Sequence, residues 1–251
     1  MRGAWDRDTV GLLIAISTLP VLIALFLADG LSLQLLVALP VVLIWQAVFR
    51  AIHATPFSAT GVVTALSFAI FAGGDLMVWQ IILSVSFGVI FAELLFGGWG
   101  RNFLSAAVVA PAFAYLSFPE IAHAAPSLIV GIGAILSAVL LLAIGIISLR
   151  ILASAAIVVA FAMFFDVLAI DAAGALIFAA VFLLCDPVAS SVTSLGRILY
   201  GTLGGALAVL FITSGQPVVN AAIYAVLLSQ IFAPLVDEIA IALHSYRRSN
   251  G

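Results

Sequence analysis

Charged residues are scarce in this chain of 251 residues, and lysine is missing altogether. Arginine, aspartate and glutamate together make up only 8% of the sequence, whereas about 25% is usual in a soluble domain. The formal net charge of −3 gives no basic surface, which argues against nucleic acid as a partner. The single cysteine, Cys185, excludes an internal disulfide and a metal site built from several cysteines.

Apolar side chains fill the sequence instead. Hydrophobic residues make up 66% of the chain, and the mean hydropathy is +1.39. They form long continuous runs rather than the alternating segments of about 10 residues that build an outer-membrane barrel. The first run, from Thr9 to Ala28, lacks a small-residue cleavage site and therefore predicts a spanning helix rather than a signal peptide. We expect an all-α integral membrane protein.

Ten apolar segments are predicted to cross or enter the membrane. They are 9–28, 31–49, 57–72, 76–97, 103–118, 127–148, 151–165, 170–185, 197–213 and 218–243. Three of them, 57–72, 103–118 and 151–165, are shorter than the roughly 20 residues that cross the hydrocarbon core. Short segments are typical of broken or re-entrant helices that line a site. A strongly tilted bundle with displaced segment boundaries is the alternative.

No linker, charge block or low-complexity stretch divides the chain. This predicts a single membrane domain over residues 1–251, with approximate halves 1–125 and 126–251. A weak internal repeat supports the halves, because Gly100-Arg101 and Gly196-Arg197 each follow a polar turn and precede an apolar segment. Transporter-like folds are often built from repeated halves, with sites at the interface between them.

The arginines predict the orientation in the membrane. Arg2 and Arg7 flank the start of the chain, Arg247 and Arg248 close it, and Arg50 follows the second segment. An even number of spans places both ends on one side, and basic residues mark the cytoplasmic side. Both termini are therefore predicted to be cytoplasmic in a multi-pass protein.

The first polar motif interrupts the apolar pattern near the middle of the chain. It reads Phe96-Gly97-Gly98-Trp99-Gly100-Arg101-Asn102-Phe103-Leu104-Ser105. Its glycines predict a turn whose backbone approaches a ligand closely, before a helix that begins at Asn102 with unpaired N–H groups. Arg101 adds a charge and Asn102 an amide. The alternative is a plain helix cap beside an interfacial arginine.

The second polar motif follows an apolar run that ends at Cys185. It reads Asp186-Pro187-Val188-Ala189-Ser190-Ser191-Val192-Thr193-Ser194-Leu195-Gly196-Arg197. Proline breaks the helical hydrogen-bond ladder, and the hydroxyls are placed to satisfy the freed groups. Asp186 could cap a half-helix or pair with Arg197 or Arg101. A serine- and threonine-rich connecting turn is the equally weighted alternative.

Carboxylates within apolar segments indicate ion or proton paths by default. Glu93, one turn before the glycine motif, is the best candidate, and Asp186 is the second. Asp166 and Asp171 are interpreted instead as two residues that bracket a loop. The three histidines lie far apart in the sequence, so no metal or haem site is predicted.

These motifs resemble those of the NqrB/RnfD family. The members are membrane subunits of the Na+-translocating NADH:quinone reductase and of the Rnf electron-transport complex. The first motif is similar to the family's F-G-G-x-G-[KR]-N-x-F/L-N-P-A, and the second resembles T-D-P-V-[ST]-x-x-x-T-x-x-G-[KR]-x-x-Y/F-G. The ending Phe232-Ala233-Pro234-Leu235-Val236-Asp237 is similar to F-A/V-P-L-[IF]-D. Together the matches cover roughly residues 55–240.

The resemblance implies about ten transmembrane or re-entrant helices in two inverted repeats, similar to the urea-transporter fold. It implies a subunit that is not catalytic alone and supports electron transfer coupled to cation movement in a bacterial inner membrane. Its partners would be other membrane and peripheral subunits of the complex, with lipid and a quinone. Family members hold an FMN esterified to a threonine and, in one branch, a riboflavin.

This chain departs from the family at the flavin positions. Ala125 aligns with the flavin-bearing threonine and has no hydroxyl, so no covalent FMN is predicted. Ser105 and Ala106 stand where the family has Asn-Pro. A non-covalent riboflavin or FMN is the remaining expectation. Its expected contacts are Gly98, Gly100, Arg101, Asn102, Ser105, Asp186 and Thr193. The alternatives are a structural anchor that has lost its redox cofactor, and a small-solute or ion channel.

Overall fold

The computed structural model describes residues 6–30, 32–72, 76–120, 126–165, 167–168 and 172–249, and within them it contains helices and no strands. The α-helices are α1 (Arg7–Ser17), α2 (Leu19–Asp29), α3 (Leu33–His53), α4 (Gly61–Phe71), α5 (Val78–Gly88), α6 (Ala106–Ser117), α7 (Leu128–Ile144), α8 (Leu149–Phe164), α9 (Ala173–Phe178), α10 (Ser194–Thr213) and α11 (Val218–Ser249). π-helical turns extend α5 over Val89–Glu93 and α9 over Ala179–Leu184.

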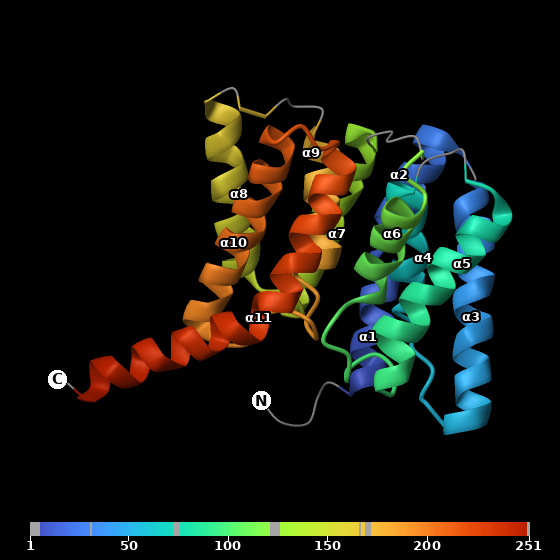
Figure 1. Ribbon diagram of the computed structural model, residues 1–251, viewed down its shortest axis with the longest axis horizontal. Coiled ribbons are helices and arrows are strands. Elements are labelled where there is room, and N and C mark those ends of the chain that lie inside the picture. The colour runs from blue at the N-terminus through green and yellow to red at the C-terminus, as the bar shows by residue number, and fades with distance from the viewer. Residues whose placement is uncertain are drawn as a thin grey trace.

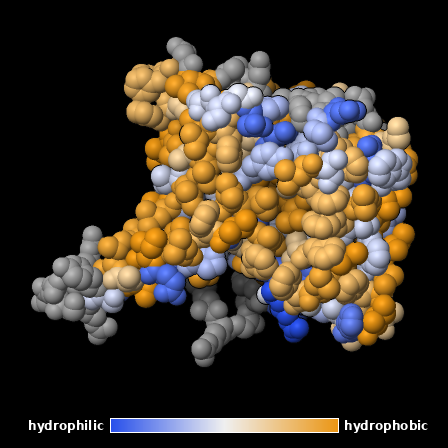
Figure 2. All heavy atoms as spheres, viewed as in Figure 1, coloured by the Kyte–Doolittle hydropathy of each residue, from blue (hydrophilic) through white to orange (hydrophobic). Residues whose placement is uncertain are grey.

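Each of the ten segments expected from the sequence contains a helix. Five helical stretches are long and apolar enough to cross a membrane: Arg7–Ala28, Leu33–His53, Val78–Phe96, Ser194–Thr213 and Val218–Ser245. Large apolar side chains lie exposed along the outside, including Ile23, Ile157 and Phe164, and Figure 2 shows apolar side chains over most of the flank of the bundle. This is the surface of an integral membrane protein, whose solvent at that depth is lipid.

Several boundaries differ from the prediction for local reasons. The helix expected at 103–118 begins only at Ala106, because the glycine turn continues through Ser105. The helix expected at 197–213 begins at Ser194, because the Thr193 side chain caps it. Gly196-Arg197 therefore lies inside a first helical turn, whereas Gly100-Arg101 lies in a loop.

The helices form two groups that lie side by side, α1 to α6 and α7 to α11 (Figure 1). α2 packs on α7, and α6 packs on α11, so both contacts join the groups. Close helix contacts depend on small residues, as is usual in membranes. A Cβ added to Gly88 of α5 would lie 2.6 Å from Ala110 Cβ and 2.7 Å from Ala110 N of α6, so the two backbones touch there.

One end of the bundle gathers the arginines. α1 and α10 begin there, α3 ends there, and α8 begins at the same end (Figure 1). Arg7, Arg50, Arg150 and Arg197 belong to the terminal turns of these four helices, so they lie at this end of the bundle. The last turns of α11 project from the bundle at this end as well. α2 and α6 end on the opposite side of the bundle, where Glu120 follows α6.

Candidate functional site

The first polar motif forms a tight turn that Asn102 holds in shape. Gly97, Gly98 and Gly100 have φ angles of 96°, 88° and 95°. Residues other than glycine are strained in this conformation. The Asn102 amide is buried, with Oδ1 accepting a hydrogen bond from Gly100 N at 3.0 Å and Nδ2 donating one to Leu104 O at 2.7 Å. Asn102 is therefore an internal brace of the turn.

The second polar motif folds around the carboxylate of Asp186. Its Oδ1 accepts a hydrogen bond from Val188 N at 2.9 Å, and the Ser105 side chain lies close to the carboxylate. Because Ser105 ends the first turn and Asp186 begins the second, this contact joins the two motifs.

Gln230 of α11 connects the end of the first motif to the π-helical turn that precedes the second motif. Its Oε1 accepts a hydrogen bond from Ser105 N at 3.0 Å, and its Nε2 donates one to Leu183 O at 3.0 Å. The side chain is almost fully buried. Both contacts are to backbone groups freed where helices are broken, which is how interrupted helices are tolerated at membrane depth.

Asp237 of α11 secures the far end of the second motif. Its Oδ1 accepts hydrogen bonds from Ser191 Oγ and Thr193 Oγ1, both at 2.6 Å, and from Thr193 N at 3.0 Å; Oδ2 accepts one from Val192 N at 3.0 Å. Thr193 Oγ1 in turn accepts from Gly196 N at 3.1 Å at the start of α10. Thr193, which we expected to contact a flavin, is thus a helix cap.

Replacing Asp237 by alanine is expected to lower the free energy of unfolding by about 2–3 kcal/mol, because two backbone N–H groups and two hydroxyls lose their acceptor. Thermal unfolding of the purified protein in detergent measures the effect. The neighbouring Glu238→Ala is the control, since Glu238 is exposed. Equal melting temperatures for the two variants would contradict this role for Asp237.

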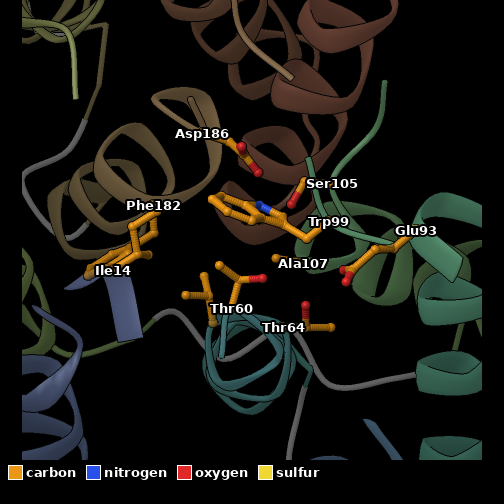
Figure 3. A pocket seen from close by; sticks show the side chains of 10 residues that line it. Ile14, Thr60, Thr64, Glu93, Trp99, Ser105, Ala107, Phe182 and Asp186 are labelled. Atoms are coloured by element: carbon orange, nitrogen blue, oxygen red, sulfur yellow. The ribbon is translucent and has the colours of Figure 1, made fainter. Parts of the chain in front are cut away.

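The two motifs and α4 enclose a central cavity of about 30 Å³ (Figure 3). The lining residues are Ile14, Thr60, Val63, Thr64, Glu93, Trp99, Ser105, Ala107, Phe182 and Asp186. Figure 3 shows the Trp99 ring in the middle of this group, with Asp186 and Ser105 on one side and Thr60 and Thr64 on another. Such a volume holds about one or two water molecules.

Two buried carboxylates face this cavity from different halves of the chain. Glu93 is 4% exposed and Asp186 is 8% exposed. The Glu93 side chain lies close to the Trp99 backbone, but its Oε1 is buried and has no hydrogen-bond partner among the described residues. An ionised carboxylate in such a place is costly unless a cation or a proton accompanies it.

The cavity does not fit a flavin. Ligand pockets usually enclose about 300–1,000 Å³, which is far above the roughly 30 Å³ found here. Of the seven residues expected to contact a flavin, only Ser105 and Asp186 line this cavity, together with Glu93 from the expected ion path. The Asn102 side chain is hydrogen-bonded within its own turn, and the Thr193 side chain caps α10. Arg101 lines a different cavity. Ala125 lies outside the described residues.

Sequence reasoning missed several residues of the site. Thr64 of the buried helix α4 and Thr60, which directly precedes this helix, contribute hydroxyls, and Trp99 contributes its ring. Arg7 lies against the glycine turn, where a Cβ on Gly100 would be 3.0 Å from its Nε. The available signal for the two threonines was their place within the apolar segment 57–72, because hydroxyls at membrane depth have to face protein or a cavity.

Comparison with known proteins gives a consistent result. The model of the NQR2, RnfD, RnfE family matches residues 2–125 and 125–243. Among similar proteins is a Na(+)-translocating NADH-quinone reductase subunit from Klebsiella pneumoniae (strain 342), 25% identical over 298 aligned residues that cover 94% of this chain and 69% of the relative. The protein of the same name from Pseudomonas aeruginosa (strain LESB58) is 24% identical over 307 residues, covering 98% and 72%.

Proposed function

Since the chain belongs to the NQR2, RnfD, RnfE family, we propose that it is the membrane subunit of a multi-protein electron-transport complex. Its relatives are named as subunits of a sodium-translocating NADH-quinone reductase. The chain is not an enzyme alone, and its partners carry the donor and acceptor chemistry. The arginine-rich end of the bundle supports an orientation with that end in the cytoplasm of a bacterium, hence an inner-membrane location.

The role of this subunit that the geometry supports best is to pass a small cation or a proton through the central cavity. One observation carries the assignment. Glu93 has a buried Oε1 without a hydrogen-bond partner in the part of the chain that the structure describes, and its side chain lines the same water-sized cavity as Asp186. The hydroxyls of Thr60, Thr64 and Ser105 supply oxygen atoms of the kind that hard cations bind. Loss of cation uptake on replacement of Glu93 is the test of this assignment.

Membership of a complex is tested by affinity purification of the tagged chain from native membranes in a mild detergent. We expect it to copurify with subunits that contain flavin, iron–sulfur or haem centres. Recovery of the chain alone, or with proteins that lack redox centres, would contradict the proposal. The first outcome would then favour a channel, and the second a structural anchor.

We expect no covalently bound flavin, because Ala125 offers no hydroxyl for a phosphoester. In-gel fluorescence after denaturing electrophoresis measures this directly, since only covalent flavin stays with the chain. A flavin-bearing subunit of a relative run in the next lane is the positive control. A fluorescent band at the mass of this chain would refute the expectation, and peptide mapping would locate the attachment.

A further inference from the structure

A second cavity, of about 290 Å³, lies at the arginine-rich end of the bundle and has no part in the proposed ion path. Its lining comes from the last turns of α3, from the segment that follows it, and from the outer side of the glycine turn. Phe49, Leu94 and Leu95 are the large apolar residues of the lining. His53, Thr55 and Arg101 are its polar lining residues, and none of the described residues that line the cavity is acidic.

Thr55 is the feature that points to a ligand. The residue is 7% exposed, and its Oγ1 is buried without a hydrogen-bond partner among the described residues. A buried hydroxyl left unpaired costs free energy, so a group that occupies the cavity and accepts its hydrogen bond is favoured. Ala54, which turns the chain from α3 towards Thr55, has a φ angle of 51° that a residue with a side chain seldom adopts.

The other groups around the cavity are cationic or able to donate hydrogen bonds. The Arg101 side chain lies over Gly97, where a Cβ would be 3.2 Å from Nη1. Arg7 contacts the same turn at Gly98 and Gly100, but it does not line this cavity. A surplus of donors and positive charge beside an apolar wall matches a phosphate group that carries hydrocarbon.

We propose that this cavity binds a phosphate group, with Arg101 and Thr55 as its ligands and His53 beside them. At the cytoplasmic surface of the membrane, the source of this phosphate is the headgroup of an anionic phospholipid. The hydrocarbon of the same lipid would contact Phe49, Leu94 and Leu95. A soluble phosphate shares the chemistry of the polar wall and is separated from the lipid by experiment. The proposal stands independently of the ion path and of the electron-transport role.

Native mass spectrometry of the full chain, released from detergent, tests the site with phosphatidylglycerol as the probe. We expect Arg101→Gln to weaken binding of the lipid about tenfold, and Thr55→Val severalfold, as is usual for hydrogen bonds to a charged group. Arg150→Gln is the matched control, because Arg150 lies at the same end of the bundle on α8 but does not line the cavity. Arg101→Lys keeps the charge and should retain most of the binding.

The arms of the experiment separate the sources of phosphate. Diacylglycerol with the same acyl chains lacks the phosphate and should bind much more weakly. Displacement of the lipid by millimolar inorganic phosphate would identify a soluble phosphate as the ligand, and its failure to displace would identify the lipid. Two results would overturn the proposal. One is that Arg101→Gln, Thr55→Val and Arg150→Gln bind phosphatidylglycerol equally well at unchanged melting temperatures. The other is that the protein binds neither phosphatidylglycerol nor inorganic phosphate.

Discussion

Cation uptake by the assembled complex should fall at least about tenfold when Glu93 is replaced by glutamine. Glutamine has nearly the shape of glutamate and keeps the contact with the Trp99 backbone, but it carries no charge for a cation and no proton to exchange. Asp186→Asn should act in the same direction, because the second carboxylate faces the same cavity. Uptake of radioactive sodium, or of protons reported by a dye, by proteoliposomes of the purified complex is the measurement.

The matched control for this experiment is Glu238→Gln. Glu238 is an exposed acidic residue of α11 that does not line the cavity, so uptake should stay within about twofold of the wild-type rate. The rate of electron transfer, recorded in the same vesicles, separates a blocked ion path from a damaged complex. Uptake by Glu93→Gln at the rate of the Glu238→Gln control would show that the cavity is not on the path.

The second large effect is expected from Gly88→Ala, which should lower the free energy of unfolding by about 3 kcal/mol. The new Cβ would lie 2.6–2.7 Å from three atoms of Ala110, two of which belong to the backbone of α6. Relief requires α5 and α6 to separate, and α6 begins directly after Ser105. Thermal unfolding in detergent and the yield of monodisperse protein both report the damage.

Gly11→Ala is the comparison variant, for which no loss of stability is expected. A Cβ at Gly11 meets its nearest neighbours at 3.6 Å, an ordinary contact, and Gly11 lies within α1. Alanine favours the helix by up to about 1 kcal/mol over glycine, so this variant should be as stable as the wild type or more so. If Gly88→Ala and Gly11→Ala had the same melting temperature, close contact between α5 and α6 would not be a requirement of the fold.

The sequence was sufficient to predict the helical membrane fold, its segments and its two polar turns. Long apolar runs predict segments that lie in the membrane, and glycine or proline predicts the points at which a helix breaks. Glu93 and Asp186 were chosen as candidates for the same reason, because a carboxylate in an apolar run has few acceptable surroundings. Both line the central cavity. All of these inferences rest on neighbours along the chain.

The parts that were missed depend on contacts between distant residues. Gln230 lies 125 residues from Ser105 in the sequence, and nothing near it predicts that its amide joins Ser105 to the π-helical turn before Asp186. Asn102 matched a family motif and was expected to contact a flavin, whereas its amide is occupied by the loop that contains it. A polar residue in a motif has several candidate partners, and only the packed structure selects among them.

The π-helical turns before the two polar motifs have a consequence for alignments with relatives. A π-helical turn holds one more residue than the corresponding turn of an α-helix, so it acts as a single-residue insertion within an otherwise continuous helix. Glu93 is the last residue of one such turn, Val89–Glu93, and the other, Ala179–Leu184, ends shortly before Asp186. A relative that is α-helical throughout would need a one-residue gap at each place. Without those gaps, an alignment correct at the upstream helices would pair each carboxylate with the wrong column.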